Sequence, residues 1–195
     1  FVIIWHVQAH ANVFNVGKGE KITSIKQAIS LAAANDTILI QSGPYKEGNI
    51  VVDKSVYLKR INRPILDGQK KFEILSVKAN NVIIEGFSLV HSGISAIDDY
   101  AGIKLYDCQN VEVRNNILDD TYFGIYVQFG KNCKVIGNHL AAYLKEEQQS
   151  GNGIHCWKSN NIIIDGNQIT GHRDGIYLEF VTNSTIKNNI SLKNI

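Results

Sequence analysis

Apolar and polar residues alternate with a period of two along most of this chain, which is typical of short β-strands and not of helices. The alternating segments recur. The dipeptide Gly-Ile begins at residues 102, 124, 153 and 175, at intervals of 22, 29 and 22 residues. Two asparagines follow each copy at fixed offsets: Asn110 and Asn116, Asn132 and Asn138, Asn161 and Asn167, Asn183 and Asn189. A fixed period with length variation in one place indicates a solenoid of stacked coils.

Aligned on this period, the apolar residues form columns. Two of them are Ile103, Ile125, Ile154 and Ile176, and Val113, Val135, Ile164 and Ile186. Side chains alternate between the two faces of a strand, so these columns are expected to face inward and to stack at about 4.8 Å. The asparagines fit corners, where Asn tolerates left-handed backbone and its amide bonds to the next coil. A leucine-rich repeat would need a Leu-dominated consensus and often a helix. The pattern predicts an all-β fold, a right-handed single-stranded parallel β-helix (a pectin-lyase-like solenoid), with seven-residue insertions within residues 90–101 and 141–152.

The two ends of the chain differ from the repeats. Residues 23–34 predict a short capping helix with Thr23 or Ser24 as N-cap and an apolar stripe that closes the core. Residues 1–11, FVIIWHVQAHA, resemble the remnant of a signal peptide that ends in Ala-x-Ala, although an opening strand is the alternative. Residues 12–195 are assigned to one β-helix domain, which we expect to be incomplete at its C-terminal end because no polar cap follows the last coil.

Charge and cysteine content argue against two properties, nucleic-acid binding and a disulfide bond. The net charge of +2 and the lack of a basic stripe argue against a nucleic-acid partner. The three cysteines fall in different columns, so buried small hydrophobic side chains are favoured over a disulfide.

One outward strand face carries residues suited to binding. Its two columns are Lys104, Tyr126, His155 and Tyr177, and Tyr106, Gln128, Trp157 and Glu179. Both insertions flank this face, and aromatic and ionisable groups on a rigid sheet suit a binding surface. The alternative is an ordinary solvated strand face.

Histidines suggest a metal. His139, His155 and His172 are predicted on or near one side, with His91 in the first insertion, and imidazole suits copper and zinc. Isolated surface histidines are the alternative, because no H-x-x-H spacing occurs. A carbohydrate-cleaving enzyme is a further alternative. In such an enzyme carboxylates would bind Ca²⁺, and Arg173 or Lys104 would act as the base that abstracts a proton from the substrate. The acids available for such a site are Asp119, Asp120, Asp174 and Glu179.

The segments GNGIHCW at residues 151–157 and GHRDGIYLEF at residues 171–180 resemble the NosD-type nitrous oxide reductase maturation proteins. The resemblance implies a periplasmic, non-catalytic protein that works with an ABC-type ATPase and permease. It implies that the protein helps to deliver copper to nitrous oxide reductase or to complete the copper-sulfide centre of that enzyme. The partner is then the reductase or a copper chaperone, and the metal is copper. The positions that match the family's segment are His172, Arg173, Asp174, Tyr177 and Glu179. The alternatives are a polysaccharide lyase or epimerase, a carbohydrate-binding module, or a structural adhesin on the same fold.

Overall fold

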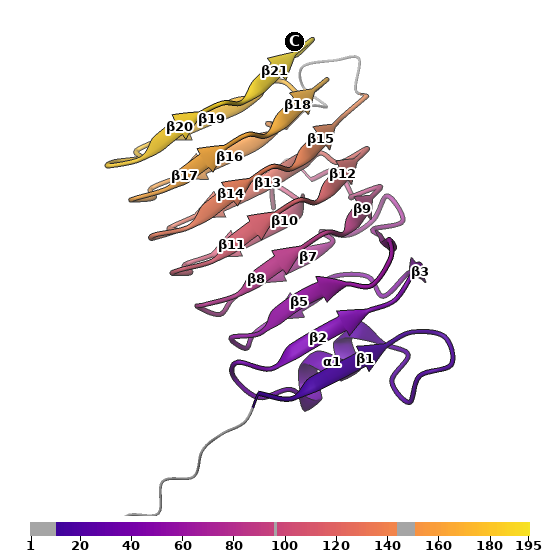
Figure 1. Cartoon of the computed structure of the whole chain (residues 1–195). Helices are drawn as coiled ribbons and strands as arrows, with labels where there is room; N and C mark the ends of the chain where they lie inside the picture. Colours follow the sequence, from indigo (N-terminus) through magenta and orange to yellow (C-terminus); the bar gives the residue numbers. More distant parts are fainter. Residues whose placement is uncertain (1–10, 96, 144–150) are drawn as a thin grey trace, which may run out of the picture.

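The computed structural model describes residues 11–95, 97–143 and 151–195, and these form a parallel β-helix (Figure 1). Successive strands of each coil belong to three different parallel sheets, and the coils stack along one axis. The predicted fold class is confirmed. Most of the predicted signal-peptide remnant, and residues 144–150 of the second insertion, lie outside the described residues.

The three sheets are named A, B and C in the order in which a coil visits them. Sheet A contains β1 (Val13–Val16), β2 (Thr37–Ile40), β5 (Tyr57–Arg60), β8 (Ile83–Glu85), β11 (Glu112–Arg114), β14 (Lys134–Ile136), β17 (Ile163–Asp165) and β20 (Thr185–Lys187). Sheet B contains β3 (Gly43–Tyr45), β6 (Pro64–Asp67), β9 (Ser88–Val90), β12 (Ile117–Asp119), β15 (His139–Ala141), β18 (Gln168–Thr170) and β21 (Ile190–Leu192). Sheet C contains β4 (Ile50–Val52), β7 (Leu75–Val77), β10 (Ala101–Tyr106), β13 (Phe123–Gln128), β16 (Ile154–Trp157) and β19 (Ile176–Glu179).

The strand registers match the predicted columns. In sheet C, Ile103 pairs with Ile125, which pairs with Ile154 and then with Ile176. In sheet A the column of Val113, Val135, Ile164 and Ile186 is also continuous. All but the last member of each column are fully buried in one core that runs along the axis. Identical registers in successive coils therefore turn the sequence period directly into stacked apolar layers.

Two asparagine ladders hold the corners. The exposed ladder places Asn110, Asn132, Asn161 and Asn183 in left-handed backbone with φ between 52° and 56°. Its amides bond from coil to coil, as in Asn161 Nδ2 to Asn132 Oδ1 at 2.7 Å. The buried ladder uses Asn116, Asn138, Asn167 and Asn189. Both corners follow from the paired asparagines of the repeat.

Helix α1 (Ile25–Leu31) packs against the first coil, with Ile25, Ala28 and Ile29 buried. It is shorter than the predicted residues 23–34, and Ser24 is its N-cap. The sequence missed one element here, strand β1, which pairs with β2 beside the helix.

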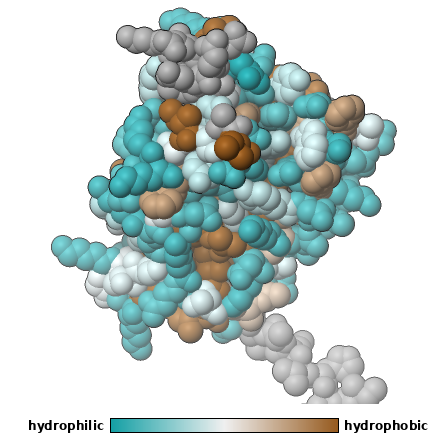
Figure 2. All heavy atoms as spheres, turned by 180° about the vertical axis from the view of Figure 1, so that it is seen from behind, coloured by the Kyte–Doolittle hydropathy of each residue, from teal (hydrophilic) through white to brown (hydrophobic). Residues whose placement is uncertain are grey.

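The three cysteines are buried and free, as predicted. Burial raises the pKa of the Cys156 thiol to about 12, so it is a packing residue at neutral pH. Within the described ranges, no helix has the length and apolarity needed to span a membrane. On the face seen in Figure 2, apolar residues gather in small separate patches among hydrophilic ones.

Candidate functional site

The outward face of sheet C carries the predicted residues in the predicted register. Lys104 pairs with Tyr126, which pairs with His155 and then with Tyr177. The neighbouring column runs through Tyr106, Gln128, Trp157 and Glu179. These strands therefore bring side chains from four coils side by side on one rigid surface.

The expectation that this column is an exposed surface is wrong for three of its four members. Lys104, Tyr126 and His155 are only 5%, 6% and 8% exposed, whereas Tyr177 is 39% exposed. The segment between β9 and β10 contributes to this burial: the Lys104 ammonium donates to the carbonyl of Asp98 at 2.7 Å. The first insertion is thus tied down onto the face that it flanks.

A second, smaller apolar cluster lies on this face, outside the main core. It contains Ala101, Tyr122, Phe123 and Tyr126, with Trp157 packed against it. The His155 ring stacks on Tyr126, with 4.5 Å between ring centroids, and meets Tyr177 edge-on at 5.1 Å. Sequence reasoning missed Tyr122 and Phe123. The available signal was that two aromatic residues directly precede Gly124, which no other Gly-Ile coil has.

His155 is neutral at physiological pH. Burial, aided by the nearby charge of Arg173, lowers the pKa of His155 to about 4, although Asp174 acts in the opposite direction. The side-chain amide of Asn152 lies 3.3 Å from Nδ1 of His155. Nε2 has no hydrogen-bond partner among the described residues. His155 therefore presents a ring nitrogen with unused hydrogen-bonding capacity beside the aromatic cluster.

His172 does not belong to the outward face. It lies in the turn between β18 and β19 and is fully buried. Burial lowers the pKa of His172 to about 4, while the carbonyls of Gly151 and Tyr122 act to raise it. Its ring fills the corner next to Gly153, where a Cβ would come within 3.3 Å of the ring carbon Cδ2.

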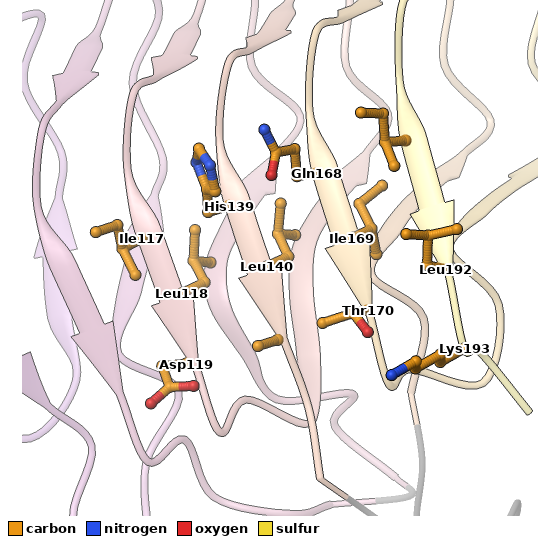
Figure 3. Close-up of a pocket in the computed structure, with 12 residues that line it drawn as sticks. Ile117, Leu118, Asp119, His139, Leu140, Gln168, Ile169, Thr170, Leu192 and Lys193 are labelled. Carbon is orange, nitrogen blue, oxygen red and sulfur yellow. The ribbon is translucent and has the colours of Figure 1, made fainter.

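The predicted grouping of His139 with the other histidines is wrong. His139 is on β15 in sheet B, whereas His155 is on β16 in sheet C. His139 faces a shallow groove of about 370 Å³ on sheet B, lined mainly by apolar side chains (Figure 3). His91 contacts Asp67, with 3.1 Å between Nδ1 and Oδ1. In the part of the chain that the structure describes, no three His, Cys, Asp or Glu residues are arranged to hold a metal ion. The acidic residues considered as calcium ligands therefore do not form a calcium site there either.

Arg173 and Asp174 border the histidine side of the face. Arg173 Nε lies 3.3 Å from Asp174 Oδ2, and both side chains are more than a third exposed. Glu179 stands opposite Trp157 on the adjacent strand. These residues, with Tyr177, form the accessible part of the predicted site.

The sequence missed a buried carboxyl group at the other end of the face. Glu73 is 5% exposed, and burial raises its pKa although hydrogen bonds from Ser76 and Tyr106 oppose the change. The Tyr106 hydroxyl donates to Glu73 at 3.0 Å, and desolvation lowers the pKa of nearby Lys104. Glu73 lies in an irregular early coil, where the repeat gives no column to identify it.

Comparisons with known proteins agree with the fold and the segment at residues 171–180. The family model described as "Periplasmic copper-binding protein (NosD)" matches residues 29–195. Two curated relatives are both named "Probable ABC transporter binding protein NosD". The one from Pseudomonas aeruginosa is 26% identical over 130 residues, 66% of this chain and 30% of the relative. The one from Stutzerimonas stutzeri is 25% identical over 139 residues, 70% of this chain and 31% of the relative.

Two further similarities are broader. A cell surface glycoprotein of Methanothermus fervidus is 30% identical over 165 residues, 82% of this chain and 26% of that protein. A solved rhamnogalacturonan lyase superposes with a TM-score of 0.64 at 12% identity, covering 89% of this chain and 56% of the lyase, which shows the shared fold. The chain spans less than a third of the length of these curated relatives. Because the family match covers most of its residues, the chain belongs to the NosD family of periplasmic copper-binding proteins.

Proposed function

We propose that this chain is the β-helix part of a periplasmic accessory protein that works with an ABC-type transporter in assembling the copper centre of nitrous oxide reductase. The observation that carries the proposal is the family match over residues 29–195, which includes the segment at residues 171–180. The two relatives named as ABC transporter binding proteins support the transporter association.

The accessible part of the sheet C face is the proposed docking surface. Four of its residues come from one coil: Arg173, Asp174, Tyr177 and Glu179. Trp157, on the preceding coil, pairs with Glu179. Aromatic and Arg side chains are the residue types that contribute most at protein interfaces. His155 contacts Tyr177 edge-on and stacks on Tyr126, which links the proposed surface to the buried part of the face.

Copper is proposed as cargo and not as a resident cofactor. The described donor set does not fit a site of three or more ligands, because His139 is on another sheet and His172 is enclosed in a corner. His155 and His172 are both neutral above pH 5, the state in which imidazole binds copper.

Complementation tests the proposal. In a denitrifying bacterium that lacks its own NosD-family protein, the full-length protein is expected to restore nitrous oxide consumption and the copper content of the reductase. A double variant, Arg173→Glu and Tyr177→Ala, is expected to lower both at least tenfold while the protein stays folded. His139→Ala is the matched control. Full activity of the double variant would contradict the proposed surface.

Copper binding is measured separately. Titration with Cu(I) compares the wild type with His155→Ala, His172→Ala and His139→Ala. We expect weaker binding in at least one of the first two and no change in the third. Unchanged binding in all three would remove these histidines from copper handling.

A second candidate function is a uronate polysaccharide lyase or epimerase. It is favoured by the buried cluster of Glu73, Lys104 and Tyr106, where burial shifts the pKa of the acid up and that of the base down. Incubation with pectate or alginate and Ca²⁺, followed at the absorbance of unsaturated uronates, separates the two. Product formation that Lys104→Ala abolishes would favour the enzyme.

A further inference from the structure

One aromatic residue per coil stands at the corner where sheet C ends, over four successive coils. This aromatic ledge comprises Tyr106, Phe129, Trp157 and Phe180. Phe129 and Trp157 are in contact, with 4.8 Å between their ring centroids. Phe129 is 43% exposed, Phe180 in the last described coil is 71% exposed, and Tyr106 and Trp157 are half-buried. The ledge therefore forms a row of rings parallel to the axis of the β-helix, and the ring of Phe129 is accessible between neighbouring coils.

Folding does not account for the two phenylalanines. Phe129 and Phe180 have φ of 55° and 53°, a left-handed backbone that bulky residues seldom adopt. Asp107 and Lys158 have φ of 50° and 46° in the equivalent position, so the corner needs this backbone but not an aromatic ring. Left-handed backbone costs a residue with a Cβ about 1–2 kcal/mol, less for Asn or Asp. A strained, exposed aromatic residue indicates a use outside the fold.

Lysines line the ledge. The Lys158 ammonium lies 4.4 Å from the Trp157 ring centroid, and that of Lys78 lies 5.3 Å from the Tyr106 centroid. Lys131 follows Phe129 in the same turn. Among the described residues, no carboxylate lies within 4 Å of these three ammonium groups. The carboxylates near the ledge are Asp107 and Glu179, in different columns of the first and last coils, and the buried Glu73, which accepts from the Tyr106 hydroxyl.

We propose that the aromatic ledge binds an extended acidic polysaccharide laid along the axis of the β-helix. Flat ring faces pack on the apolar faces of sugars, and the three lysines complement carboxylate groups. Successive coils are about 4.8 Å apart, close to the advance of one sugar residue in an extended chain. The rings and lysines follow one another from coil to coil along the axis, which suits a linear polymer with repeating sugar faces and acid groups.

Affinity electrophoresis and calorimetry on the full-length protein test this proposal, with polygalacturonate and alginate as acidic probes and hydroxyethylcellulose as the neutral probe. The wild type is expected to bind at least one acidic polymer, more weakly at high salt. The double variant Phe129→Asn and Phe180→Asn is expected to bind at least tenfold more weakly. Because Asn tolerates left-handed backbone, the variant is expected to melt at the same temperature or higher.

The matched control is Lys193→Asn. Lys193 is an exposed residue with φ of 54° on the sheet B side, so the same backbone change is made away from the ledge, and binding is expected to stay unchanged. Binding to neither acidic polymer, or equal binding to the neutral one, would overturn the proposal. So would unchanged affinity in the double variant. Recovery of a protein bound at the ledge in place of a glycan would assign the surface to a protein partner. None of these outcomes depends on copper-centre assembly.

Discussion

At the scale of single residues, buried polar groups carry much of the specificity of this fold. His155 and His172 are enclosed as neutral rings, and Asn138 is enclosed in a ladder of amides. Each group is costly to leave unsatisfied, so its neighbours determine what it contributes. The charge state of the histidines and the hydrogen bonds of the ladder can be tested separately.

Stability is expected to fall as the pH is lowered from 6.5 towards 4. The unfolded chain protonates its histidines near pH 6.5, whereas burial keeps the pKa of His155 and His172 at about 4 in the folded protein. The unfolded state therefore binds more protons in this window, which costs up to about 3 kcal/mol for each ring. Thermal melts between pH 7.5 and 4.5 measure the effect.

His155→Gln is expected to lose part of this pH dependence, and His139→Gln, on the exposed strand position of sheet B, serves as control. An identical slope in wild type and His155→Gln would contradict the assignment.

The buried ladder is expected to be more sensitive than the exposed one. Asn138 donates to Val113 O and Asn167 Oδ1, both at 3.0 Å, and accepts from Asn116 N at 3.0 Å. Asn138→Ala leaves several of these groups unsatisfied and is expected to cost about 3 kcal/mol. Asn132→Ala, in the exposed ladder, is expected to cost about 1 kcal/mol through its left-handed backbone. Urea unfolding compares them, and equal losses would contradict the distinction.

At the scale of elements, α1 depends on a residue distant in the sequence. The Glu47 carboxylate accepts from Ile25 N at 2.8 Å and from the Ser24 hydroxyl at 2.7 Å. A carboxylate at a helix N-terminus satisfies free amides and interacts favourably with the helix dipole. The turn after β3 thereby fixes the helix over the first coil.

Glu47→Ala is therefore expected to lower the free energy of unfolding by about 1–2 kcal/mol. Glu47→Gln, which keeps one acceptor oxygen, is expected to fall between this variant and the wild type. Chemical denaturation measures the order of the three proteins. No loss in the alanine variant would show that Ser24 alone caps the helix.

At the scale of the whole molecule, the sequence period predicts the features that recur in every coil, but it does not predict contacts made by a single insertion. The columns through Ile103 and Val113 follow from spacing alone, because every coil has the same register. The burial of Lys104 does not follow, since it depends on an insertion folding over the face. The period also does not group the histidines correctly, because a corner of variable length separates His139 on sheet B from His155 on sheet C.

Protection of backbone amides is expected to vary along the axis. Leu178 and Ile186 occupy inward positions in the last coil and are 40% and 42% exposed, whereas their counterparts in the coil before are buried. Neighbour contacts supply most of the stability in a solenoid. Hydrogen exchange of this chain is therefore expected to be slowest in β10 and β13 and fastest in β19–β21. Uniform exchange would indicate one all-or-none unit.

The corner between sheets B and C varies in length from coil to coil without changing how the strands pair. Three residues join β12 to β13, and twelve join β15 to β16. Even so, Asp119 still pairs with Ala141, and Ile125 with Ile154. A change in the length of this corner is therefore compatible with unchanged strand registers on either side of it. The corner thus offers an insertion site at which recognition loops of different length can be exchanged beside the sheet C face.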